Sequence, residues 1–211
     1  MAVHLAQIKA FLNRPGIEGP QQLRGYIPCH RKSGGTANFR GPESGHPDDF
    51  TAMGISGVTI ATGVDLGQTD EAWLTRYGLD VKHIAIVRPY LGLRQGAAIQ
   101  KLFSFPLAVS RETADTLDMT ILSIHAERIP ARYNRDNPAT AFEDLPWQSQ
   151  TAIFSLLFQR GTGVAGKAPN TWAAFVRGDW KDAANRLRNP ALWDGYHLRR
   201  RMEGELLMEI V

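Results

Sequence analysis

The sequence predicts an α+β fold that is predominantly helical and carries one small β-hairpin lobe. Residues 56–68 read SGVTIATGVDLGQ, where apolar and polar residues alternate between glycines, as is typical of a half-buried strand that can turn. Most of the later sequence instead spaces its apolar residues three and four apart, the period of an amphipathic helix. We therefore expect one short β element inserted into a helical chain.

The composition is that of a globular protein. The 211 residues are 43% hydrophobic and 21% charged, so we expect a single domain, with a β-containing lobe at about residues 14–70 and a helical lobe from the remainder. No stretch approaches the roughly 20 apolar residues that cross a bilayer, so no membrane span is expected. The net charge of +3 favours anionic partners without choosing among them.

Helical segments are expected on both sides of the hairpin. Residues 3–13 carry apolar side chains at helical spacing. A second apolar stripe runs through residues 111–129 and is expected to stop before Pro130, because proline breaks a helix interior. Residues 146–159 are apolar enough to form the central buried helix.

Two polar residues of the β-like stretch, Thr59 and Asp65, are candidate catalytic groups. On one extended strand their side chains would share a face but lie roughly 20 Å apart. They can act together only if the chain reverses near Thr62 and Gly63, where glycine supplies the positive φ that tight turns demand. A hairpin at this point is therefore a requirement of any shared chemistry.

Glycoside hydrolysis is one reaction that these residues suit. It needs a proton donor for the leaving oxygen and, in the inverting route, a second carboxylate that activates water. Glu18 follows Ile17 and is expected in an apolar setting near Tyr26, which suits a general acid. Asp65 is expected to stay solvated and ionised, while the Thr59 hydroxyl holds the attacking water.

Three segments resemble the lysozyme-like domain of pesticin-type bacterial toxins, which is related to phage lysozymes. They are EG at residues 18–19, GYIP at residues 25–28 and the stretch 56–68. In the later sequence, residues 145–163 resemble the central helix of that family and residues 196–207 its closing arginine-rich helix. The resemblance implies a lysozyme-like fold with a small β-hairpin lobe.

The resemblance also implies a reaction and its catalytic residues. Glu18 takes the place of the general acid, and Thr59 and Asp65 take those of the groups that position and activate water. The implied activity is that of a muramidase, which hydrolyses the β-1,4 bond between N-acetylmuramic acid and N-acetylglucosamine in peptidoglycan. One departure is Ala61, where the family has glycine, and we expect the change to be tolerated if the local backbone is β-like.

Further residues are expected to contact the substrate or to support the fold. Tyr26 belongs to one of the matching segments, whereas Gln159 and Arg160 end an apolar helix, where polar groups commonly face a cleft. The arginine run at 199–201 is expected to form a solvated or salt-bridged face, with Glu203 as an internal partner or a surface acid. These expectations assign substrate binding to Tyr26, Gln159 and Arg160.

Residues 30–53 predict a long exposed loop, since they are rich in Gly, Pro, Ser and charge and lack periodicity. The loop introduces Glu43, Asp48 and Asp49, which compete with Asp65 for the role of second carboxylate. We favour Asp65, because a hairpin holds a catalytic group more rigidly than such a loop does.

No cofactor and no metal are expected. Cys29, the single cysteine, has no CxxC partner, so together with His30 and His46 it gives only a weak zinc pattern. We expect a monomer whose partners are peptidoglycan and an immunity or inhibitor protein, and we expect no nucleic acid. The alternative to an enzyme is a non-catalytic peptidoglycan-binding or partner-binding domain with a lysozyme fold.

The N-terminal residues lack the basic and apolar regions of a secretory signal peptide. We expect synthesis in the cytoplasm and action in the periplasm or cell wall, after delivery by a holin or a secretion system. The residues do not separate a phage lysin from a secreted antibacterial effector.

Overall fold

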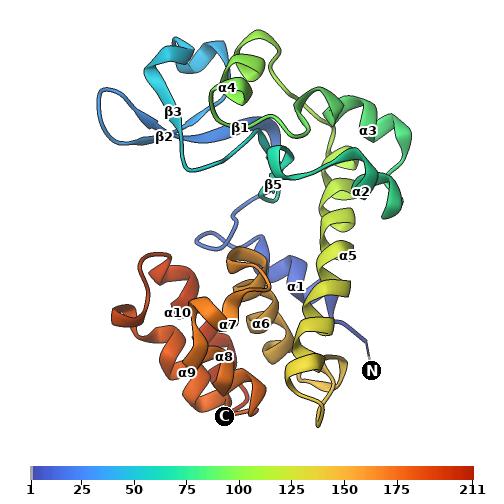
Figure 1. The fold of residues 1–211 in the computed structure, drawn as a ribbon, viewed down its shortest axis with the longest axis vertical. Coiled ribbons are helices and arrows are strands. Elements are labelled where there is room, and N and C mark those ends of the chain that lie inside the picture. Colours follow the sequence, from blue (N-terminus) through green and yellow to red (C-terminus); the bar gives the residue numbers. More distant parts are fainter. Residues whose placement is uncertain (1) are drawn as a thin grey trace. The chain divides into compact units, whose positions relative to one another are not determined.

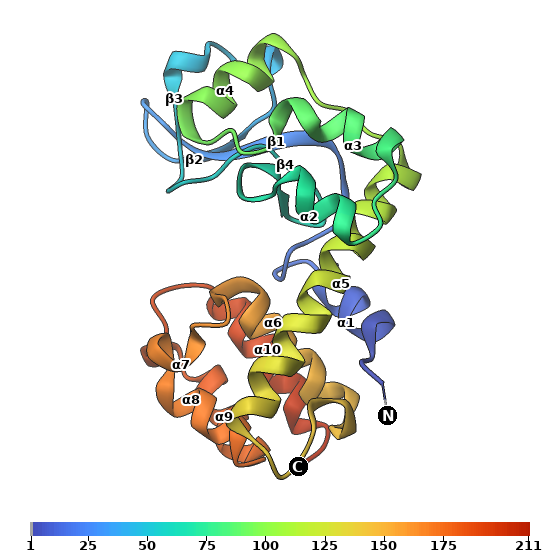
Figure 2. The same ribbon diagram turned by 45° about the vertical axis from the view of Figure 1, so that its right-hand side comes forward.

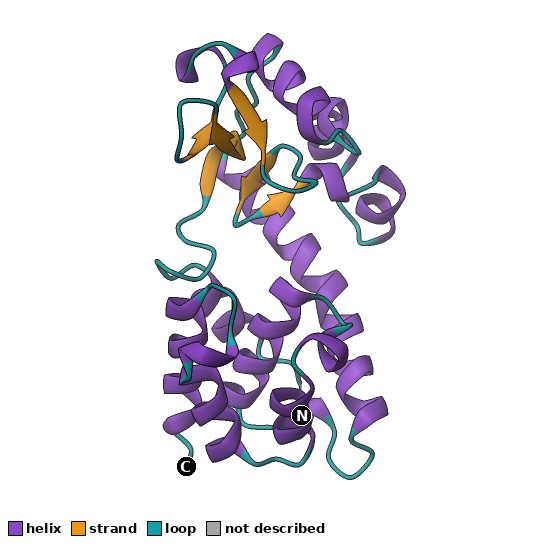
Figure 3. Cartoon of the chain, turned by 60° about the vertical axis from the view of Figure 1, so that its left-hand side comes forward, coloured by secondary structure: helices purple, strands orange, loops and turns teal. Residues whose placement is uncertain are grey.

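The computed structural model describes residues 2–211, which form two compact units. The helical unit comprises the chain up to Gly19 together with Leu122–Val211, and the β-containing unit comprises Pro20–Ile121. The strands all lie in the second of these units (Figure 3). The β-containing unit thus extends to Ile121, past the lobe at about 14–70 that the sequence suggested, and the single domain stays a prediction.

The β-containing unit is built on an antiparallel sheet with β1 at its centre. In space the strands follow the order β2-β1-β4-β5, while β3 also pairs with β1. The strands are β1 (Gln22–Arg31), β2 (Thr36–Phe39), β3 (Phe50–Ala52), β4 (Thr59–Ala61) and β5 (Val64–Asp65).

The predicted long loop at residues 30–53 is wrong, because this segment forms part of the sheet. Cys29 of β1 pairs with Ala37 of β2 and with Ala52 of β3. Phe39 is fully buried, and its ring centroid lies 5.0 Å from that of Phe50. Strands β2 and β3 are short, and glycines separate them from each other and from β1. The alternation of apolar and polar residues in them is therefore too short to predict a strand from the sequence.

The predicted reversal in the central β-like stretch is confirmed. Strands β4 and β5 form a tight antiparallel hairpin in which Thr59 pairs directly with Asp65 and Ile60 with Val64. Gly63 lies in the turn with φ of 76°. The hairpin therefore places the two candidate catalytic residues opposite each other.

Three short helices and the start of a long one cover the sheet. They are α2 (Glu71–Arg76), α3 (Val81–Val87), α4 (Gln95–Ser104) and α5 (Arg111–Asp136) (Figure 1). Ile60 and Leu66 of the hairpin are fully buried in the same apolar core as Leu102 of α4 and Leu117 of α5. The hairpin of β4 and β5 is thus anchored on its apolar side by this core.

The helical unit packs around one apolar helix. Its helices are α1 (Leu5–Leu12), α6 (Trp147–Arg160), α7 (Val164–Lys167), α8 (Pro169–Val176), α9 (Trp180–Arg188) and α10 (His197–Met208), with the second half of α5. Helix α6 is buried from Ser149 to Leu157, as its composition predicted, and α10 packs against both α6 and α9 (Figure 2).

The helix that was expected to stop before Pro130 continues for six residues beyond it, so that boundary is wrong. Helix α5 runs from Arg111 to Asp136 with Pro130 inside it. Proline costs the helix one backbone hydrogen bond. The next turn compensates through burial, because Tyr133 is fully buried and its hydroxyl donates to the Phe175 carbonyl oxygen at 3.4 Å.

His125 on α5 packs against aromatic rings of α6, and this position should make stability depend on pH. Its ring centroid lies 4.7 Å from that of Phe158 and 6.2 Å from that of Phe154. Burial, together with the charge of Arg128, lowers the pKa of His125 to about 4. The imidazole is therefore neutral in the folded protein at pH 7.

Between about pH 6.5 and pH 4, His125 binds a proton in the unfolded chain but not in the folded protein. We therefore expect the wild type to lose stability as the pH falls through this range. The free energy of unfolding should be fully retained above about 6.5, the ordinary histidine pKa, and should fall by about 3 kcal/mol as the pH approaches 4. Urea denaturation of His125→Leu at several pH values should show a smaller loss. Parallel pH curves for the two proteins would contradict this role.

The predicted fold class is confirmed. Helices make up 58% of the structure, and the sheet is small and antiparallel. None of the helices between residues 2 and 211 combines the length and apolarity that crossing a bilayer requires.

Candidate active site

The carboxylate of Asp65 is held by hydrogen bonds from its own surroundings. Its Oδ1 accepts from the backbone N–H of Gly57 at 3.1 Å and of Gly67 at 2.9 Å, and its Oδ2 accepts from the Gln68 amide at 2.9 Å. Such bonds fix the orientation of the carboxylate. A carboxylate held in this way suits the role of a general base.

Gly57 and Gly67 are required here by close approach. A Cβ atom added to Gly57 would lie 2.5 Å from the Gly67 Cα atom and 2.5 Å from the Leu93 carbonyl oxygen. A Cβ atom added to Gly67 would meet the same carbonyl oxygen at 2.5 Å. Gly57 and Gly67 therefore allow three backbone segments to meet beside Asp65.

Tyr26 of β1 belongs to the same group of residues as Thr59 and Asp65. Tyr26 pairs with Thr59 across β1 and β4, and Thr59 pairs with Asp65 across β4 and β5. Directly paired residues of antiparallel strands project to the same face, so these side chains are neighbours. The Arg40 guanidinium lies over the Tyr26 ring, 5.4 Å from its centroid. The structure thus brings three of the predicted site residues together.

The turn of the hairpin is fixed by Asp118 of α5, a residue that the sequence reasoning missed. The buried Asp118 carboxylate accepts from the Thr62 backbone N–H at 2.8 Å and from the Thr62 hydroxyl at 2.8 Å. It also accepts from the Gln21 amide at 2.8 Å. Asp118 therefore holds the turn that sets Thr59 opposite Asp65.

Ala61 does not have the β-like backbone that its position suggested. Its φ is 52°, in the left-handed region that favours glycine, and its side chain is fully buried. This conformation gives a physical reason for the glycine that the family has here. Alanine is tolerated because its single methyl group costs only about 1–2 kcal/mol in this region.

Substitutions at Ala61 test whether its backbone is left-handed or β-like. We expect Ala61→Val to lower the free energy of unfolding by about 2 kcal/mol or more, because a β-branched residue is strained at positive φ and overfills the core. Ala61→Gly should change it by less than about 1 kcal/mol, since relieved strain offsets the added chain entropy. Urea denaturation measures both. A valine variant as stable as the wild type would contradict the assignment.

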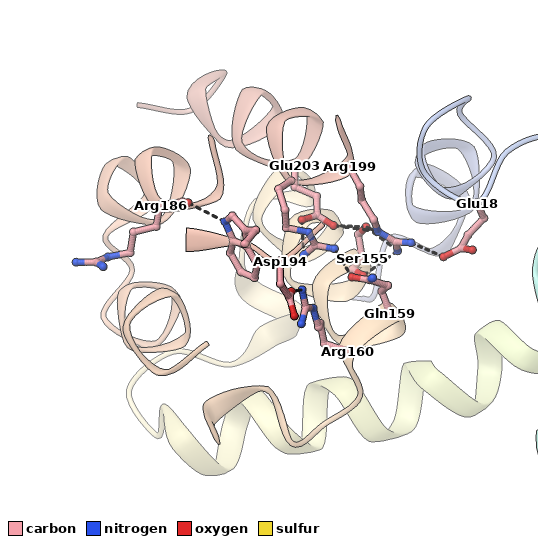
Figure 4. A network of polar contacts seen from close by, with 10 residues as sticks. Glu18, Ser155, Gln159, Arg160, Arg186, Asp194, Arg199 and Glu203 are labelled. Atoms are coloured by element: carbon pink, nitrogen blue, oxygen red, sulfur yellow. Dashed lines mark hydrogen bonds and ion pairs between the residues drawn. The ribbon is translucent and has the colours of Figure 1, made fainter. Parts of the chain in front are cut away.

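Glu18 lies in the helical unit, where its carboxylate is bound to an arginine. It follows α1, and its backbone N–H donates to the Leu12 carbonyl oxygen at 3.0 Å. Its Oε1 accepts a hydrogen bond from the Arg199 guanidinium of α10 (Figure 4). The apolar setting that the sequence predicted for Glu18 is therefore wrong. Arg199 instead fixes where the carboxylate lies.

Arg199 is itself buried and anchored to the central helix. Its side chain is only 2% exposed, and its guanidinium donates to the Ser155 carbonyl oxygen at 2.9 Å and to the Ser155 hydroxyl at 3.0 Å. Its Nε lies 3.3 Å from Oε1 of Glu203. The ion pair of Glu18 is thus continuous with an interior network between α6 and α10.

Glu203 and Arg200 complete this network. Both are fully buried, with Arg200 Nη1 2.8 Å from Glu203 Oε2, and the Ser155 hydroxyl donates to Glu203 Oε1 at 2.6 Å. Burial raises the pKa of Glu203, and the guanidinium groups of Arg200 and Arg199 oppose that shift. Burial lowers the pKa of Arg200 to about 10, so it remains charged at pH 7. Of the solvated or salt-bridged face that the sequence predicted, Arg199 and Arg200 are salt-bridged but buried, and the internal partner predicted for Glu203 is found.

Gln159 and Arg160, the predicted substrate residues of α6, lie beside this network (Figure 4). Gln159 Oε1 accepts from the Arg200 guanidinium at 2.7 Å. Arg160 donates to the exposed Asp194 carboxylate at 2.8 Å and lies 5.6 Å from the centroid of the Trp193 ring. Their contact with substrate stays a prediction.

The predicted site residues therefore form two sets, one in each unit. Tyr26, Thr59 and Asp65 share one face of the sheet, whereas Glu18 is joined through arginines to the end of α6 that carries Gln159. Between residues 2 and 211 no cluster of three or more His, Cys, Asp or Glu side chains is arranged to hold a metal ion. The catalytic roles stay predictions.

Comparison with known protein families identifies the chain. The family model Pesticin, described as "Bacterial toxin homologue of phage lysozyme, C-term", matches residues 9–181. The chain belongs to this family. No curated protein matches this pesticin-family chain.

The match confirms the resemblance read from the hairpin and the N-terminal segments. The matched residues of the pesticin-family chain include Glu18, Thr59 and Asp65. Arg199 and Glu203 of α10 lie beyond the matched range, so the likeness of the closing helix to the family is not tested by it. The family is one of lysozyme-related bacterial toxins.

Proposed function

We propose that this pesticin-family protein is a muramidase that hydrolyses the β-1,4 bond between N-acetylmuramic acid and N-acetylglucosamine in peptidoglycan. The observation that carries the proposal is the direct pairing of Thr59 with Asp65, whose carboxylate accepts hydrogen bonds from two backbone N–H groups and one amide. Membership of a family related to phage lysozyme supports the same reaction.

The proposed chemistry is a single displacement at the anomeric carbon. In the proposed reacting form Glu18 carries its proton on Oε2, while Oε1 still accepts the hydrogen bond from Arg199. The Oε2 proton passes to the glycosidic oxygen as the bond between that oxygen and the anomeric carbon breaks. A water held by the Thr59 hydroxyl attacks the same carbon and loses its proton to Asp65. Glu18 is left ionised and Asp65 protonated, and exchange with solvent restores both. This route inverts the configuration, whereas a covalent intermediate on Asp65 would retain it.

Mass spectrometry of the fragments released from purified peptidoglycan tests the proposal. We expect disaccharide peptides that end in reducing N-acetylmuramic acid, with the first anomer detected by NMR being the inverted one. Fragments that end in anhydro-muramic acid would instead show that the protein is a lytic transglycosylase and not a hydrolase. Binding to peptidoglycan without any release of reducing ends would favour the alternative, a non-catalytic wall-binding domain.

We further propose that the protein acts on the wall of a bacterial cell after delivery to the periplasm by a holin or a secretion system. The description of the family as bacterial toxins supports an antibacterial role. A producing cell would then need an immunity or inhibitor protein. Co-expression of neighbouring genes with a periplasm-directed form of the protein, scored by survival, tests this partner.

A further inference from the structure

A groove lined by three arginines runs along α5 in the helical unit. Its volume is about 410 Å³, and it is lined by Arg128, Ala131, Arg132, Arg135 and Thr162. The arginines are four and three residues apart, so they project from the same face of the helix. The volume falls in the range of about 300–1,000 Å³ that is usual for small-molecule sites.

The middle arginine is rigidly held. Arg132 Nε donates to Asp136 Oδ2 at 2.8 Å, and its Nη1 donates to the Thr162 carbonyl oxygen at 2.6 Å. Its guanidinium carbon lies over the Trp172 ring, 5.4 Å from the centroid, and its side chain is 16% exposed. One of the groups that line the groove is therefore a preorganised guanidinium.

The carboxylate of Asp136, beside the groove, accepts hydrogen bonds from more than one arginine. Asp136 accepts from Arg132, from Arg135 at 3.2 Å and from the Trp172 indole N–H at 2.8 Å. Burial raises the pKa of Asp136, but these hydrogen bonds outweigh it and hold the pKa below its ordinary value. One ionised carboxylate thus faces two guanidinium groups, and Arg128 also lines the groove. The groove is a positively charged site.

The spacing of the arginines limits which ligand fits. Arg128 and Arg135 are seven residues apart, or about 10 Å along the helix axis. Guanidinium groups bind carboxylates and phosphates through paired N–H donors, and Arg135 is 67% exposed, with only its Nε bonded to Asp136. A ligand with oxyanion groups up to about 10 Å apart matches this row of donors.

We propose that the α5 groove binds a ligand carrying two or more oxyanion groups, carboxylates or phosphates, of a cell-envelope polymer. The assignment of the ligand to the envelope rests on the proposed function. The binding of oxyanions in the groove does not depend on the proposed function, and it can be measured without any catalysis. Failure of the groove and failure of the muramidase proposal are therefore distinguishable.

Titration of the full chain, followed by NMR of the arginine side-chain N–H groups, tests the groove. The probes are inorganic pyrophosphate, a muramyl tripeptide with free carboxylates and the same tripeptide with its carboxylates amidated. At low ionic strength, where charge pairs are least screened, we expect the first two to shift the signals of Arg128, Arg132 and Arg135. Binding of pyrophosphate alone would assign phosphate polymers, and binding of the acidic tripeptide alone would assign wall peptides.

A matched pair of variants locates the binding. Arg128→Ala combined with Arg135→Ala should weaken binding about tenfold or more, while Arg132 is kept because it supports the fold. The control is Arg201→Ala, which removes an exposed arginine of α10 in the same unit and should leave the affinity unchanged. Equal affinity of the double variant and the control, equal binding of the amidated tripeptide, or no shift with either acidic probe would overturn the proposal.

Discussion

Glu18→Gln is expected to slow peptidoglycan hydrolysis by about a hundredfold to ten-thousandfold, the usual contribution of a general acid. The amide has no acidic proton for the leaving oxygen, but its carbonyl oxygen can still accept the hydrogen bond from the buried Arg199. The variant should therefore keep the fold while it loses the chemistry. The release of reducing ends measures activity, and circular dichroism with urea denaturation measures folding.

Glu205→Gln is the matched control for this substitution. Glu205 is an exposed carboxylate of α10 that lies 3.6 Å from the exposed Arg201, so its loss removes the same charge away from Glu18. We expect wild-type rates from this control. If folded Glu18→Gln also hydrolysed peptidoglycan at the wild-type rate, Glu18 would not be the general acid and its pair with Arg199 would be structural only.

The hairpin of the site was predictable because its signals are local. Gly63 marks the turn, and the alternation from Val58 to Ala61 marks the strand, so the pairing of Thr59 with Asp65 followed from a short stretch. The backbone of Ala61 was not predictable in the same way. Alternation reports which side chains are buried and says nothing about the sign of φ.

Asp118 was missed because its partner is distant in the sequence. It bonds to Thr62 across a separation of 56 residues, and a single carboxylate in an amphipathic helix carries no sign of being buried. Only the fold shows that this carboxylate fixes the turn of the hairpin. Similarly, the short strands that replace the predicted loop at 30–53 owe their stability to pairing with β1.

The interior network of the helical unit was only half predictable. The spacing of Arg199 and Glu203 is that of a helical ion pair, which the sequence shows. The burial of Arg199 and Glu203 was not predictable from the sequence. Charged residues are almost never fully buried unless they are paired, so an arginine-rich helix is expected at the surface. A further signal was Ser155, a polar residue within the apolar run at residues 152–158 of α6, which needs a hydrogen-bond partner in the core.

Glu203→Leu is expected to lower the free energy of unfolding by about 3–5 kcal/mol, the cost of leaving buried charges without their partner. Glu203 is fully buried and faces Arg199 and Arg200, so an apolar side chain there leaves two interior guanidinium groups with reduced compensation. This is a large share of the roughly 5–15 kcal/mol that stabilises a typical protein. Urea denaturation at pH 7 measures the change.

Glu203→Gln keeps the test informative if the leucine variant fails to fold. Its amide oxygen can still accept from Ser155 or Arg199, so we expect a smaller loss than for leucine. Glu205→Leu on the same helix is the control and should cost less than about 0.5 kcal/mol, because Glu205 is exposed. Arg199 also fixes the Glu18 carboxylate, so activity should fall with each loss of packing at Glu203. Leucine and glutamine variants within about 1 kcal/mol of the wild type would show that the network does not hold α6 to α10.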